Sequence, residues 1–83
     1  MSDEEVLKAV IAIAQRVFKE ENNHSITIKT SAEDIFAWNS LNHVVFIEEV
    51  EQHFGVRFDL DAMLAIESIG DICTQVKAMI VKQ

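Results

Sequence analysis

Ser40 is the residue in this sequence whose surroundings best suit a chemical role. It lies in Trp38-Asn39-Ser40-Leu41, where a polar, mixed segment meets a strongly helical one. A serine in the first turn of a helix exposes its hydroxyl beside free N–H groups and the positive end of the helix dipole. This setting favours an attached phosphate, and the adjacent residues do not indicate a hydroxyl activated as a catalytic nucleophile.

Two pairs of side chains at helical spacing suggest other chemistries. His43 follows Ser40 by three residues and shares its helix face, but a Ser-His hydrolase also needs an orienting carboxylate and an oxyanion site. Glu49 and His53 are four residues apart and suit a metal, yet two ligands do not make a structural site. We therefore expect no catalytic residue and no bound metal, and we expect His43 to line an attached arm or a partner surface.

Hydrophobic periodicity predicts the two helices that lead to and from Ser40. Residues 3–20 carry a wide apolar face and begin with Ser2 and Glu5 in a capping-box pattern. Residues 40–54 form a second helix that begins after Asn39, a favourable N-cap. We expect the second helix to bury a stripe made of Leu41, Val44, Ile47, Val50 and Phe54.

The rest of the chain predicts two further helices and a long connection. Gly55 ends the second helix, a short helix covers 60–66, and Ser68 with Asp71 begins a last helix. That last helix buries a stripe containing the single cysteine, Cys73, which we expect to be an inert buried thiol. The stripe consists of Ile69, Ile72, Cys73, Val76 and Ile80.

The connection over residues 21–39 is the least regular segment. Asn22, Asn23 and His24 stop the first helix, and residues 31–36 suggest a single helical turn. A connection of this length normally packs its own side chains onto the domain. The residues expected to do so are Ile26, Ile28, Ile35, Phe36 and Trp38.

Length and composition predict one all-α domain over residues 1–83: a small four-helix bundle with three longer helices, one short third helix and a long first loop. The net charge of −7 argues against binding to nucleic acid or to anionic membranes. It favours partners with basic docking patches. The acidic N-terminus lacks the basic region of a secretion signal, and no apolar run approaches a membrane span. We expect a cytoplasmic monomer.

Three spaced segments carry a family resemblance. Trp38-Asn39-Ser40-Leu41 resembles the Asp-Ser-Leu signature of acyl carrier proteins. The following helix, through residues 48–56, resembles the acidic helix of that family with its terminal Phe and turn. Ser68-Ile69-Gly70-Asp71-Ile72 resembles the usual opening of the family's final helix.

The resemblance implies that Ser40 is esterified by 4′-phosphopantetheine, which a phosphopantetheinyl transferase takes from coenzyme A with the help of magnesium. The thiol of this arm would carry acyl groups as thioesters between the enzymes of fatty-acid, lipid or polyketide-type biosynthesis, and the three-helix core would shelter the acyl chain. Acyl-transferring or acyl-activating enzymes would contact Asn39, Leu41, Glu48 and Glu51. The protein itself would not be an enzyme.

The sequence also departs from the family pattern. Asn39 stands where the family has aspartate, so the helix cap is kept and a negative charge near the transferase's metal is lost. Val45 and Gln52 occupy positions that are often acidic in fatty-acid carriers. These differences favour a specialised carrier in a dedicated pathway. The alternatives are an unmodified interaction module of the same fold and a carrier of amino-acyl or peptidyl groups.

Overall fold

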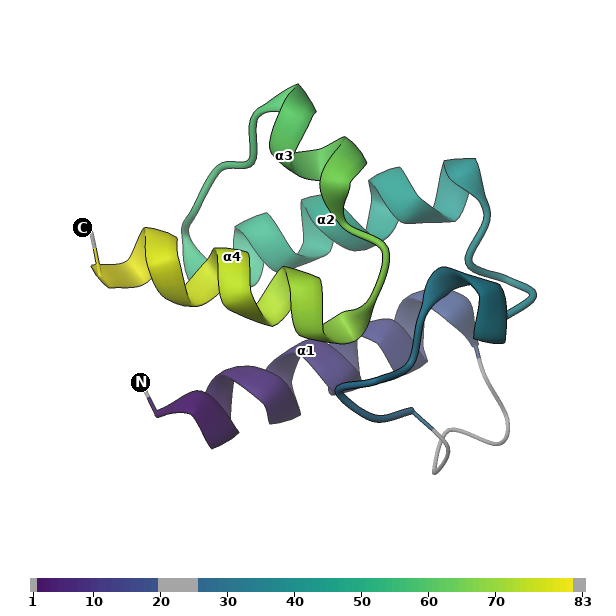
Figure 1. Cartoon of the computed structure of the whole chain (residues 1–83), viewed down its shortest axis with the longest axis horizontal. Coiled ribbons are helices and arrows are strands. Elements are labelled where there is room, and N and C mark those ends of the chain that lie inside the picture. Colours follow the sequence, from purple (N-terminus) through teal and green to yellow (C-terminus); the bar gives the residue numbers. More distant parts are fainter. Residues whose placement is uncertain (1, 20–25, 82–83) are drawn as a thin grey trace.

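The computed structural model describes residues 2–19 and 26–81 and confirms the all-α architecture (Figure 1). Three long helices and one short helix make up the bundle, and a short 3-10 helix interrupts the first connection. Their bounds are α1 Asp3–Phe18, η2 Ala32–Asp34, α2 Ser40–Phe54, α3 Leu60–Ala65 and α4 Ile69–Val81.

Helix α1 packs against both α2 and α4. In Figure 1, α3 lies above the other helices and connects the end of α2 to the start of α4. The amino end of α2 lies at the same end of the bundle as η2, so the first connection leads from η2 directly to Ser40.

The ends of α1 and α2 follow the predicted capping rules. Ser2 and Glu5 form the reciprocal capping box: each side chain accepts a hydrogen bond from the backbone N–H of the other residue. These bonds hold the pKa of the Glu5 carboxyl below its usual value of 4.5. At the other end, Lys19 adopts a left-handed conformation with φ 50° and ends α1. The predicted stop at 22–24 lies outside the described residues. Gly55, with φ 67°, ends α2 as predicted.

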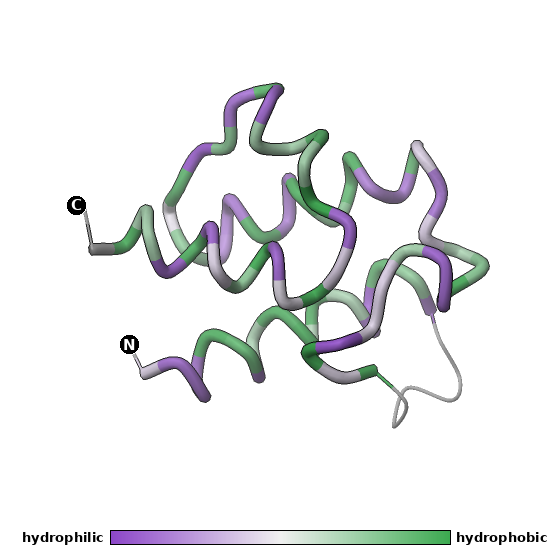
Figure 2. Tube along the Cα trace, viewed as in Figure 1, coloured by the Kyte–Doolittle hydropathy of each residue, from purple (hydrophilic) through white to green (hydrophobic). Residues whose placement is uncertain are grey.

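The core is built from the apolar faces of the three long helices. As predicted, α4 buries Ile69, Ile72, Cys73 and Val76, but Ile80, which was expected in the same stripe, is only partly buried. The stripe predicted for α2 was partly wrong: Leu41 and Val44 are exposed, and Phe46 is fully buried instead. Phe46 faces inward because its ring packs edge-on against Phe18 and Trp38, and the Trp38 indole fills the interior next to the first turns of α2. Figure 2 shows apolar and polar residues alternating along the helices, as two-sided helices require.

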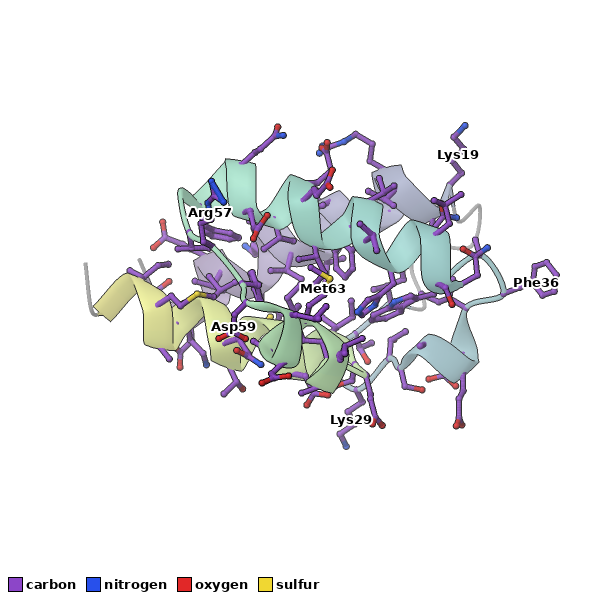
Figure 3. The ribbon with its side chains drawn as sticks, turned by 90° about the horizontal axis from the view of Figure 1, so that it is seen from above. Lys19, Lys29, Phe36, Arg57, Asp59 and Met63 are labelled. Atoms are coloured by element: carbon purple, nitrogen blue, oxygen red, sulfur yellow. The ribbon has the colours of Figure 1, made fainter. Side chains whose placement is uncertain are left out.

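The first connection is anchored through three of the five residues predicted to pin it. Ile26, Ile35 and Trp38 are buried, whereas Ile28 is nearly half exposed and Phe36 is fully exposed. The reason is local: Ile35 is in an extended conformation, so successive side chains point to opposite sides. Ile35 enters the core, and Phe36 points away from the body of the protein (Figure 3).

Backbone hydrogen bonds join the first connection to the start of α4. The N–H groups of Ile69 and Gly70 donate to the carbonyl oxygens of Thr30 and Ile28, each over 2.9 Å. A side chain at Gly70 would place its Cβ 3.0 Å from the Ile28 oxygen, so this close approach favours glycine. Ser31 and Ser68 form an isolated antiparallel bridge here.

Candidate functional site

Ser40 is the first residue of α2, and its position is fixed from both sides. Asn39 is the N-cap, and its Oδ1 accepts from the backbone N–H of Asn42 over 2.9 Å. The side-chain amide of Asn42 donates in turn to the carbonyl oxygen of Ala37 over 2.8 Å, which ties the connection to the helix. Asn39 and Ser40 both remain exposed. The hydroxyl of Ser40 is therefore presented on a rigid helix end.

A groove of about 440 Å³ opens between α2 and α3, beside Ser40. This volume lies in the range of about 300–1,000 Å³ that is usual for small-molecule sites. Asn39 and Ser40 form its polar edge, and His43 contributes to its floor. Figure 3 shows Met63 of α3 directed toward α2. The apolar residues that line the groove are Ala32, Trp38, Val44, Leu60, Met63, Leu64 and Ile66.

Both ring nitrogens of His43 are engaged in hydrogen bonds. The indole Nε1 of Trp38 lies 2.9 Å from His43 Nδ1, and the Met63 carbonyl oxygen lies 2.9 Å from His43 Nε2. An indole N–H only donates, so Nδ1 must be the acceptor and Nε2 must carry the proton that bonds Met63. His43 therefore has no free nitrogen to accept a proton from Ser40. A Ser-His catalytic pair is not formed in this arrangement.

The surface around Ser40 carries exposed apolar side chains. Leu41, the residue after Ser40, is 74% exposed, which makes it available for the partner contact predicted for it. Phe36 projects from the preceding connection at the same end of the bundle (Figure 3). Clusters of exposed apolar residues mark interaction surfaces. The other exposed apolar side chains on α2 and α3 belong to Val44, Val45, Leu60 and Leu64.

The acidic residues of α2 have different environments. Glu48 is exposed, as expected of a partner-docking residue. The Glu51 carboxylate accepts from the backbone N–H of Phe58 over 2.7 Å and so holds the bridge that leads to α3. Glu49 pairs with Arg16 of α1 over 2.6 Å. Glu51 therefore has a structural hydrogen bond within the domain, in addition to the partner contact that the family resemblance implies for it.

Within residues 2–19 and 26–81, no three His, Cys, Asp or Glu side chains gather closely enough to hold a metal ion. Cys73 is buried, and desolvation raises the pKa of its thiol to about 11, opposed by the smaller effect of nearby Lys77. The thiol is thus protonated at neutral pH and unreactive, as predicted. None of the helices in the described ranges combines the length and the apolar character needed to cross a membrane.

Sequence reasoning identified the cap and the exposed serine but missed the contact between Trp38 and His43. The available signal was the tryptophan itself, because a buried indole N–H usually finds an acceptor. The two residues are five positions apart in the sequence, on either side of the start of α2. Their meeting therefore depends on how the connection enters α2, which helical periodicity does not describe.

Comparison with protein families gives a match over most of the chain. The family model for the phosphopantetheine attachment site covers residues 8–76, which include Ser40, the groove and all three long helices in part or in full. The sequence matched none of the curated proteins to which it was compared.

Proposed function

Because the chain belongs to the phosphopantetheine attachment site family, we propose that Ser40 is the residue that bears its 4′-phosphopantetheine. Domains of this family are carriers rather than enzymes, and their cofactor is this covalently attached arm. The arm supplies a thiol on which acyl groups are carried as thioesters. Interaction with a modifying transferase and with the enzymes that use the carried group follows from membership of the family.

One observation carries the assignment to Ser40: it is an exposed hydroxyl at the amino end of α2, on the edge of an apolar groove. The other serines that the structure describes use their hydroxyls locally. Ser2 and Ser68 accept from backbone N–H groups at helix starts, and Ser31 bonds the Asp34 carboxylate. The residues around Ser40 thus fit an attached arm, with the groove beside it to take apolar parts of that arm.

In the modification step, Ser40 contributes Oγ to a new phosphodiester. A bond in the pyrophosphate of coenzyme A breaks, the adenosine bisphosphate portion leaves, and the serine proton passes to a base of the transferase. The first backbone N–H groups of α2 and the positive end of its dipole stabilise the negative charge of the diester.

The proposed carrier is a cytoplasmic, monomeric, single-domain protein that serves acyl transfer in a dedicated lipid or polyketide-type pathway. Asn39, Val45 and Gln52 support a specialised member, because they reduce the negative charge on and before the helix that begins at Ser40. Leu41 and Glu48 are the proposed partner contacts, with basic groups of the partner enzyme opposite Glu48. Asn39 also supports the second candidate, an unmodified interaction module, because the charge beside the transferase's metal is missing.

The test is an intact-mass spectrum after incubation with coenzyme A, magnesium and a broad-specificity transferase. We expect an added mass of one phosphopantetheine, located on the peptide that contains Ser40. Ser40→Ala should fold normally and gain no mass, and Ser31→Ala should be modified like the wild type. Unmodified wild type beside a fully modified control carrier would favour the interaction module. Modification of Ser40→Ala would show that the attachment residue is wrong.

A further inference from the structure

The floor of the groove beside Ser40 is closed by one hydrogen-bonded bridge. The bridge runs from the indole of Trp38 through the imidazole of His43 to the carbonyl oxygen of Met63. It joins three segments, because Trp38 precedes α2, His43 belongs to α2 and Met63 belongs to α3. All three residues also line the groove beside Ser40.

Aromatic rings fill the space behind the bridge. The Trp38 ring stacks on Phe18 with centroids 5.1 Å apart and meets Phe46 edge-on at 5.5 Å. Phe18 and Phe46 also contact each other edge-on. Trp38 is 5% exposed and Phe46 is completely buried. The interior next to Ser40 is therefore occupied by large, mutually packed side chains that resist displacement.

The groove does not reach the centre of the bundle. Its lining includes Trp38, His43 and Met63 at the floor, but none of the fully buried residues of the three long helices. Examples of those residues are Phe46, Ile47, Ile69 and Ile72. A group that enters the groove from Ser40 meets the bridge before it meets the core.

We infer that the bridge of Trp38, His43 and Met63 closes the core to the carried acyl group, which stays in the surface groove and is short or polar. The inference rests on the proposed function, and it assigns His43 as a specificity-determining residue that acts through Trp38 and Met63. A long aliphatic chain would remain in contact with water at this site and would lack the burial that stabilises apolar groups.

The experiment compares acetyl- and octanoyl-loaded carriers by the NMR signals of their backbone amides. In the wild type, the octanoyl group should shift signals of groove residues such as Val44 and Leu64 and leave those of Phe46 and Ile72 in place. In His43→Ala, which removes the middle of the bridge, the octanoyl group should shift the core signals as well. His53→Ala, a change of an exposed histidine on the same helix, should behave like the wild type.

A second variant, Trp38→Phe, keeps the inference testable if His43→Ala does not fold. Trp38→Phe keeps an aromatic ring in the core but removes the indole N–H, so it should also admit the octanoyl group. Core signals that shift in the wild type as much as in His43→Ala would overturn the inference. Core signals that stay in place in the wild type and in both bridge variants would overturn it too, because the bridge would then not be what closes the core.

The two proposals fail separately. If the transferase adds nothing to Ser40, the proposed function fails, and the cargo question is answered with Ser40→Cys alkylated by acyl-pantetheine analogues at neutral pH. Cys73 does not compete, because it is buried and its thiol has a pKa of about 11. If the arm is attached and the octanoyl group shifts the wild-type core signals, only the inference about the bridge fails.

Discussion

The indole N–H of Trp38 donates to Nδ1 of His43 over 2.9 Å, although Trp38 lies near the end of the first connection and His43 in the first turn of α2. The same imidazole donates from Nε2 to the Met63 carbonyl oxygen, so it sets the position of α3 relative to Ser40. A neutral histidine is required, because protonated imidazole would offer two donors and could not accept from the indole.

Removal of this imidazole should destabilise the fold. His43→Ala leaves the buried indole N–H of Trp38 without its acceptor, so the free energy of unfolding should fall by about 1–3 kcal/mol. Urea denaturation followed by circular dichroism measures the change. His53→Ala is the matched control and should stay within about 0.5 kcal/mol of the wild type. Equal losses in the two variants would mean that the bridge adds nothing to stability.

Asn39 allows the helix cap and the local charge to be separated. Asn39→Ala removes the acceptor for the Asn42 N–H and should cost about 1 kcal/mol of stability. Asn39→Asp keeps a capping oxygen and adds a negative charge, so stability should be preserved while arm transfer to Ser40 becomes faster. Transfer rates come from intact-mass time courses with a limiting amount of transferase. If the arm is transferred to Asn39→Asp and to the wild type at the same rate, the transferase does not respond to this charge.

Glu48 and Glu51 should give different phenotypes despite their proximity. Glu48→Lys should slow association with a partner enzyme that has a basic docking patch, and the effect should shrink as salt is raised. Stability should hardly change, because exposed charges contribute little. Stopped-flow association at low and high salt measures the first effect. An unchanged rate at low salt would remove Glu48 from the docking face.

For Glu51 the hydrogen bond matters more than the charge. Glu51→Ala deprives the buried Phe58 segment of the acceptor for its N–H and should cost about 1–3 kcal/mol. Glu51→Gln keeps an oxygen acceptor at that position and should recover most of the loss. Chemical denaturation of both variants provides the comparison, and equal destabilisation by Ala and Gln would contradict the role given to the bond.

The capping box of α1 should make stability depend on pH on the acid side. The folded pKa of Glu5 is lowered by the hydrogen bonds from Ser2, so its contribution is present above the unfolded value of 4.5 and is lost as the pH falls through the folded pKa. Between about pH 6 and about pH 3, the wild type should lose more stability than Glu5→Gln, which keeps an acceptor but does not titrate. Denaturation midpoints measured across this pH range test the difference. If the wild type and Glu5→Gln lose stability in parallel, Glu5 is not a source of the pH dependence.

The elements with local signals were predictable, and those set by tertiary packing were not. Capping side chains and apolar spacing define α1, α2 and the start of α4, and the position of Ser40 follows from its cap at Asn39. The sequence indicated that Ile47 and Val50 face inward but not that Phe46 does so in place of Leu41 and Val44, because Phe46 packs against rings on two other segments. Neither did it indicate that Glu51 would accept a bond from beyond the helix end, since Phe58 reaches it only after the chain turns at Gly55.

The amino-acid composition makes the bridge observable by tryptophan fluorescence. Trp38 is the single tryptophan in a chain without tyrosine, so its fluorescence can be excited alone, and its indole is both a lining residue of the groove and the donor to His43. The protein thus contains its own optical reporter beside Ser40. Emission from this indole registers the wetting or filling of the groove and the opening of the bridge, without any label on the carrier.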